Sequence, residues 1–162
     1  MKRLICILLA NCLMLSGCSL TRERIKEPVT FYYIQEDFQK DMEQLLASEF
    51  REASGHRDDL TYLLALYSMG PSSEDLKSPI PGNTMIIPTA RTEDSIELSL
   101  SENALTLTDS EFTLAGACIA VTCMGLINVQ QVTIACGDRN ITIRDNLLLS
   151  NTSVVNQQEE LH

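Results

Sequence analysis

The stretch EFTLAGACIAVTCMGLI, residues 111–127, decides the fold class of this chain. It predicts a helix that begins near Asp109 or Ser110, because either side chain can accept hydrogen bonds from the exposed amides of a first helical turn. After Phe112 the segment is almost wholly apolar or small. A helix of this composition must be covered by other elements on most of its sides.

Two strands joined by a turn are predicted after this helix. QVTIAC, residues 131–136, has the β-branched pattern of a strand, and Gly137 and Asp138 are typical turn residues. NITIR, residues 140–144, then predicts a second strand that completes a hairpin. The helix is therefore followed directly by sheet.

Two more strands are predicted before the helix. In SIELSLS, residues 95–101, apolar and polar side chains alternate, which is the pattern of a strand with one face in water. MIIPTA, residues 85–90, predicts a strand that Pro88 interrupts. Because proline cannot donate to a sheet, this strand suits an edge or a bulge.

A shorter helix is predicted from Arg57 to Ser68. One apolar stripe lies at helical spacing, and the acidic residues at 58–59 fall in the first turn, where they stabilise the helix dipole. Gly70 and Pro71 end the helix. The stripe consists of Leu60, Leu63, Leu64 and Tyr67.

The segment before this helix is ambiguous. VTFYYI, residues 29–34, predicts a buried strand because it is rich in β-branched and aromatic residues. In residues 36–52, however, Phe38, Met42 and Leu45 recur at helical spacing, while LLASEFREA could equally form the second arm of a hairpin. The local pattern favours a helix here.

Together these elements predict an α+β fold, a two-layer sandwich with two main helices on one face of a small mixed or antiparallel sheet. The predicted domain covers residues 29–148, which is one domain and not two. Residues 149–162 have no hydrophobic period and are predicted to be a disordered tail.

The N-terminus predicts export. Residues 1–17 contain a basic start, a twelve-residue apolar run that is too short to span a bilayer, and then Ser16 and Gly17. With Cys18 this ending resembles the lipobox of bacterial lipoproteins, in which the cysteine receives lipid, including palmitate, and cleavage occurs before it. Two acyl chains would anchor the protein stably to the extracytoplasmic face of the cell membrane, with residues 18–28 as a tether. The alternatives are an ordinary signal peptide with Cys18 as an incidental thiol, or an uncleaved short membrane helix.

The composition limits the partners. The formal net charge is −10, and it becomes more acidic if the basic N-terminus is removed. We therefore expect no nucleic-acid binding, and membrane attachment through lipid alone. Three cysteines remain after Cys18, an odd number that argues against a disulfide framework. Buried thiols are the favoured interpretation for Cys118, Cys123 and Cys136, although Cys136 could pair with either of the others.

The sequence contains little that predicts catalysis. The only histidines are His56, which precedes a helix among charged residues, and His162, the last residue. There is no G-x-S-x-G motif, and acidic residues are so abundant that any carboxylate pair is uninformative. The segment DRNITIRDN, residues 138–146, begins like a calcium loop but lacks the required sixth-position glycine and has Leu149 at the twelfth position. We predict no enzyme activity, no cofactor and no metal.

Several landmarks resemble the GerMN domain of sporulation and spore germination proteins. They are FYYIQ, ASEFRE with Glu49 and Arg51, LLALYSMGP, SPIPGNTMI, SIELSLS, and the apolar helix before VQQVTIACGD, over roughly residues 30–143. The resemblance favours a strand for the later half of residues 36–52. It also implies a module similar to ring-building folds that works by protein contact, without a cofactor or a reaction.

The resemblance and the predicted anchor together suggest a function. We expect a lipid-anchored envelope protein of spore-forming cells that contacts other envelope or sporulation proteins, with homo-oligomers possible. The alternative is an extracytoplasmic cell-wall enzyme or a small-ligand-binding lipoprotein. Two details stay open. Glu49 and Arg51 either pair across a sheet or face water. The IPGNT turn, residues 80–84, either sets the geometry of a strand entry, which is the favoured interpretation, or makes contacts with a partner.

Overall fold

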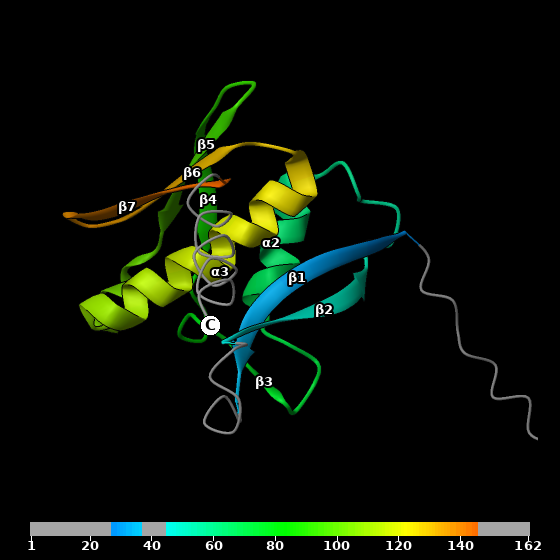
Figure 1. The fold of residues 1–162 in the computed structure, drawn as a ribbon, viewed down its shortest axis with the longest axis horizontal. Coiled ribbons are helices and arrows are strands. Elements are labelled where there is room, and N and C mark those ends of the chain that lie inside the picture. Colours follow the sequence, from blue (N-terminus) through cyan, green and yellow to red (C-terminus); the bar gives the residue numbers. More distant parts are fainter. Residues whose placement is uncertain (1–26, 37–44, 146–162) are drawn as a thin grey trace, which may run out of the picture.

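Two sheets and two α-helices make up the part of the chain that the structure describes (Figure 1). The structure is a computed structural model, and it describes residues 27–36 and 45–145. In chain order the elements are β1 (Pro28–Gln35), β2 (Leu46–Glu52), α2 (Leu60–Ser68), β3 (Leu76–Lys77), β4 (Ile86–Arg91), β5 (Ser95–Leu100), the 3-10 helix η1 (Glu102–Thr106), α3 (Asp109–Ile127), β6 (Gln131–Cys136) and β7 (Arg139–Arg144).

The larger sheet has the strand order β4-β5-β6-β7. The β5–β6 pair is parallel and the other two pairs are antiparallel. α3 connects β5 to β6, which is the long crossover that a parallel pair requires. Side chains in β5 and β6 alternate between buried and more exposed, so the predicted strand pattern is confirmed. β4 lies at the edge, and its pairing shifts between Pro88 and Ala90, so the proline marks both an edge and a bulge.

Both helices contact this sheet. α3 contacts β6 and β7, while α2 contacts β4. The approach of α3 is close because Gly116 has no side chain: a Cβ there would lie 2.9 Å from Cγ2 of Ile141. The predicted α+β class, with two main α-helices and a mixed sheet, is confirmed.

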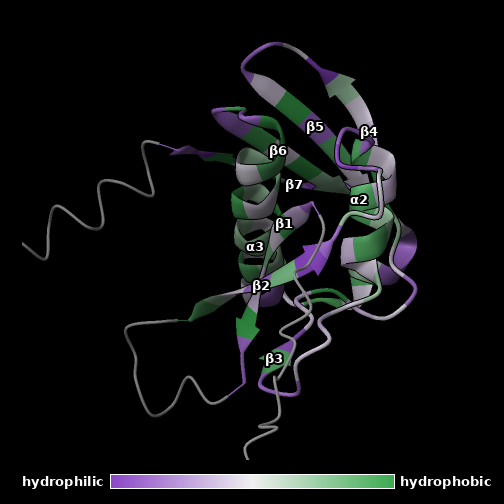
Figure 2. Ribbon diagram, turned by 90° about the vertical axis from the view of Figure 1, so that its right-hand side faces the viewer, coloured by the Kyte–Doolittle hydropathy of each residue, from purple (hydrophilic) through white to green (hydrophobic). Residues whose placement is uncertain are grey.

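The first strands form a separate sheet, which the sequence did not predict. Its order is β2-β1-β3, and β1 buries Val29, Phe31 and Tyr33 on one face. α3 also contacts β1, and Figure 2 shows this helix between the two sheets. Thr122 of α3 accepts a hydrogen bond from the main-chain N–H of Tyr32 at 3.0 Å, so the helix binds the side of β1 that carries no strand at this point.

Packing on both sides explains the composition of α3. The helix is long and apolar enough to cross a membrane, but here much of it is buried inside the domain. Among its buried residues are Ala115, Cys118, Ile119 and Ala120. The prediction that this helix must be covered on most sides is confirmed.

The helix boundaries differ slightly from the prediction. α2 begins at Leu60, three residues after Arg57, because Asp59 is the N-cap and its Oδ1 accepts a hydrogen bond from the N–H of Tyr62 at 3.1 Å. α3 begins at Asp109 as predicted, but the capping side chain is Thr108. In both helices a side chain just before the first turn satisfies an exposed amide.

The ambiguous segment is resolved in its later half. β2 pairs antiparallel with β1, as the hairpin interpretation requires, so the helical interpretation of residues 46–52 is wrong. Cross-strand pairing with β1 outweighs the local helical spacing. Phe38 and Met42 lie outside the described residues, as do the predicted signal peptide 1–17, nearly all of the tether and the tail 149–162. The predicted domain, residues 29–148, is described up to Asp145 except for residues 37–44.

Candidate interaction surface

The predicted lipidation site, Cys18, lies outside the described residues together with Ser16 and Gly17. The same holds for His162. Lipidation therefore stays a prediction from the sequence, and the structure bears only on the domain that the anchor would carry.

His56 precedes a helix, α2, as the sequence predicts. This side chain is exposed, and its ring stacks on that of Tyr62, with 4.4 Å between the ring centroids. Within residues 27–36 and 45–145, no three His, Cys, Asp or Glu side chains are grouped so that they could hold a metal ion. The calcium-like segment from residue 138 forms the β6–β7 turn and strand β7.

The three cysteines of the domain are free and buried, which confirms the buried-thiol interpretation. Burial raises the pKa of the thiols of Cys118 and Cys123 to about 12 in each case. A thiol that stays protonated is a poor nucleophile. Cys136 donates a long hydrogen bond to the carbonyl of Ser101, at 3.6 Å.

Three aromatic residues form the centre of the core under β1. The rings of Tyr33 and Tyr67 stack with centroids 4.9 Å apart, and Phe31 meets both edge-on. Each hydroxyl has a main-chain acceptor: Tyr33 donates to the carbonyl of Tyr67, and Tyr67 donates to the carbonyl of Tyr32. Burial raises the pKa of both phenols, so these tyrosines are structural.

Glu49 and Arg51 hold the loop after α2. They are neighbours on one face of β2, and their charged groups lie 3.8 Å apart. Arg51 also donates to the carbonyl of Gly70 at 3.1 Å, and the Glu49 carboxylate accepts from the N–H of Ser72 at 3.0 Å. Both side chains therefore fix the end of α2 against the smaller sheet, and they pair along one strand instead of across two.

The IPGNT turn is fixed by hydrogen bonds. Thr84 donates through its hydroxyl to the carbonyl of Pro81 at 2.7 Å, and Asn83 adopts a left-handed conformation with φ 63°. The side chain of Asn103 donates to the Asn83 carbonyl at 3.1 Å. The turn thus sets the geometry of the chain before β4, as predicted.

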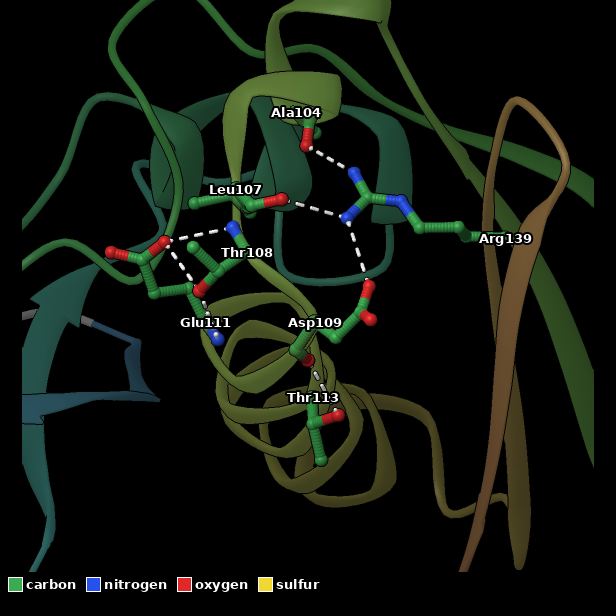
Figure 3. A network of polar contacts seen from close by, with 7 residues as sticks. All are labelled: Ala104, Leu107, Thr108, Asp109, Glu111, Thr113 and Arg139. Carbon is green, nitrogen blue, oxygen red and sulfur yellow. Dashed lines mark hydrogen bonds and ion pairs between the residues drawn. The ribbon is translucent and has the colours of Figure 1, made fainter.

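A polar network that the sequence analysis missed joins β7 to the start of α3 (Figure 3). Arg139 donates to the carbonyls of Leu107 and Ala104, at 2.7 and 2.9 Å. Its guanidinium also lies 4.7 Å from the ring centroid of Phe112 and 3.8 Å from the carboxylate of Asp109. No local pattern marks an arginine at the start of a hairpin strand for this role.

The capping box at the start of α3 completes this network. Glu111 accepts from the main-chain N–H of Thr108 at 2.8 Å, while its own N–H donates to the Thr108 hydroxyl. The hydrogen bond from the Thr108 main chain, and then that from its hydroxyl, lowers the pKa of Glu111. The network therefore joins η1, the start of α3 and β7 through contacts within the fold.

The strongest candidate for an interaction surface is a hollow between α2 and β4, which we call the α2–β4 groove. It has a volume of about 500 Å³. Three large apolar side chains on it are exposed: Met69 by 78%, Met85 by 61% and Ile87 by 48%. Its lining residues are Thr61, Ala65, Ser68, Met69, Asn83, Thr84, Met85, Ile86 and Ile87, and none of them is charged.

A second hollow lies at the C-terminal end of α3. Tyr32, Val121 and Met124 contribute apolar surface, and acidic side chains surround them. The volume is about 590 Å³. Glu93, Asp94 and Asp145 provide these acids, and no basic residue lines the hollow. Its polarity makes it a weaker candidate for apolar protein contact than the α2–β4 groove.

Comparison with solved structures finds two similar folds. The first GerMN domain of the sporulation protein GerM from Bacillus subtilis superposes with a TM-score of 0.50 and 10% sequence identity, covering 70% of this chain and 85% of that one. A protein from Clostridium perfringens, described as a putative lipoprotein, has a TM-score of 0.44 and 13% identity, covering 74% and 89%. No family model and no curated protein matches the chain. Only the first similarity bears on the fold.

The similarity to GerM agrees with the fold that the sequence resemblance implies. Both lines of evidence cover most of the domain, and at this low identity they concern the fold and not the chemistry. The described part of the chain therefore has a fold similar to that of a GerMN domain, as the sequence resemblance predicts.

Proposed function

We propose that this chain is a lipid-anchored protein on the extracytoplasmic face of a spore-forming cell, and that it acts by contact with other envelope proteins in sporulation or germination. The observation that carries the proposal is the fold similarity to a GerMN domain of a sporulation protein. The lipobox-like ending at Cys18 supports the anchor, and the exposed apolar side chains of the α2–β4 groove support protein contact. We also propose that the protein is not an enzyme.

The anchor is tested by the intact mass of the protein extracted from membranes. The wild-type protein should lack residues 1–17 and carry a diacylglycerol on Cys18. The Cys18→Ser protein should keep residues 1–17 and carry no lipid. Cys12→Ser is the matched control, since Cys12 lies within the apolar run and should leave lipidation unchanged. An unacylated wild-type protein would refute the anchor.

The role is tested by deleting the gene in the spore-forming host and counting heat-resistant spores. Complementation with wild type should restore the count, and complementation with Cys18→Ser should not. An unchanged spore count in a strain without paralogues contradicts the proposed role. Turnover of cell-wall fragments by the purified protein would instead support the enzyme alternative.

A further inference from the structure

The α2–β4 groove differs in charge from the chain as a whole. The chain has a formal net charge of −10, yet no charged residue lines the groove. Met69, Met85 and Ile87 are half of the exposed large hydrophobic residues identified in the described part of the chain, and all three gather here. Concentrated apolar exposure of this kind marks a binding surface, and methionine side chains adapt well to a partner.

The groove runs along the free edge of β4. Met85, just before β4, and Ile86 and Ile87, its first two residues, all line it, although successive side chains of an extended chain point to opposite faces. A hollow that all three border must therefore follow the edge of the strand and not one face of it. β4 is a terminal strand of its sheet, so this edge has no partner strand among the described residues.

The outer edge of β4 has main-chain groups that can form hydrogen bonds with a short extended segment. The carbonyl of Met85 accepts from the N–H of Ser101 on the β5 side, so in the antiparallel alternation the N–H and C=O of Ile86 point outward. Pro88 has no N–H, and a bulge follows it. The edge is therefore suited to a few residues of an extended segment, and not to a long strand.

Acidic residues lie close in sequence to residues that line or contact the groove. Asp58 and Asp59 lie just before α2. At the other wall, Glu102 precedes Asn103, whose side chain binds the carbonyl of Asn83. The basic residue of β4, Arg91, lies beyond the bulge.

We infer that the α2–β4 groove binds an extended segment of a partner protein, with apolar side chains at alternate positions and lysine or arginine on both sides of them. The segment adds to the edge of β4 next to Ile86 and places its apolar side chains against Met69, Met85 and Ile87. A second copy of this chain is the less suitable occupant, because two chains with the same large net charge repel each other. The inference rests on the proposed function and gives the chemistry of the partner.

The test uses the full chain in detergent and a fluorescent synthetic peptide in which alternating leucines and threonines are flanked by lysines. We expect saturable binding that weakens as salt is added, and about tenfold weaker binding to Met85→Ser, because the methionine side chain is a central contact. Phe50→Ser is the matched control: Phe50 is equally exposed, at 61%, but lies on β2 away from the groove, so binding should not change.

Two further peptides separate the parts of the inference. A peptide with N-methylated leucines should bind poorly, since it cannot pair with a strand edge, and one flanked by glutamates should bind poorly because of repulsion. Equal binding to Met85→Ser and Phe50→Ser, or equal binding of the glutamate peptide, would overturn the inference. The inference would also be overturned if sedimentation showed that the wild-type chain self-associates and that Met85→Ser abolishes this association. A normal spore count with intact peptide binding would refute only the sporulation role.

Discussion

Replacing Gly116 by alanine should destabilise this protein, although alanine is the better helix former. In a helix interior the change from glycine to alanine stabilises by about 1 kcal/mol through backbone entropy. At Gly116, however, the new Cβ would lie 2.9 Å from Cγ2 of Ile141, with Ile134 and Ile143 also in contact. Overpacking of this kind costs roughly 1 to 3 kcal/mol, so the net effect should lie between neutral and about 2 kcal/mol destabilising.

Gly125 provides the matched control in the same helix. A Cβ at Gly125 would have no neighbour within 4 Å, so Gly125→Ala should stabilise by about 0.5 to 1 kcal/mol. Thermal unfolding of the detergent-solubilised full chain, followed by circular dichroism, measures the difference. For a domain of this size we expect the melting temperature of Gly116→Ala to be roughly 2 to 12 °C below that of Gly125→Ala.

A double-mutant cycle tests the cause. In an Ile141→Ala background the obstructing methyl group is absent, so Gly116→Ala should become stabilising, as at Gly125. If Gly116→Ala and Gly125→Ala raise the melting temperature equally in the wild-type background, the close approach of α3 to β7 does not limit the packing and the reasoning is refuted.

Three other predictions concern polar and titratable groups. Arg139→Ala should lower the free energy of unfolding, measured in urea, by about 2 to 4 kcal/mol because two carbonyls lose a charged donor. Arg139→Lys should recover only part of this stability. An unchanged free energy of unfolding in Arg139→Ala would contradict the network. Thr122→Val should lower the free energy of unfolding by about 1 to 3 kcal/mol and speed hydrogen exchange of the Tyr32 amide, because that amide loses its acceptor. Thr122→Ser keeps the hydroxyl and should have neither effect. Unchanged exchange in the valine variant would disprove the contact. Cys118 and Cys123 should react with a thiol reagent only after unfolding, because both thiols are buried. Their pKa in the folded protein is raised to about 12. Their contribution to the free energy of unfolding should therefore be complete below about pH 8.5 and be lost as the pH rises towards 12. Labelling of the native protein at pH 8 would show that the thiols are accessible.

Some of the missed features had a signal in the sequence and others had none. Thr122 is a polar residue inside an apolar helix, and a buried hydroxyl must find a partner, so its role could have been anticipated. Arg139 is the first residue of β7, and the carbonyls it binds are more than thirty residues away. The α2–β4 groove likewise depends on Met69, at the C-cap of α2, and Met85, just before β4, which are distant in the sequence.

The sequence alone determined the elements with a strong local pattern. The apolar run from Phe112 to Ile127 required a covered helix, and the alternation in residues 95–100 required a strand with one exposed face, because these periods follow from backbone geometry. Tertiary structure alone decided that the strands divide into two sheets with α3 between them, and that the edge of β4 is left open beside α2. Sheet pairing and grooves arise from contacts between residues that are distant in the sequence, and the local hydrophobic pattern of a strand does not predict which distant residue it will contact.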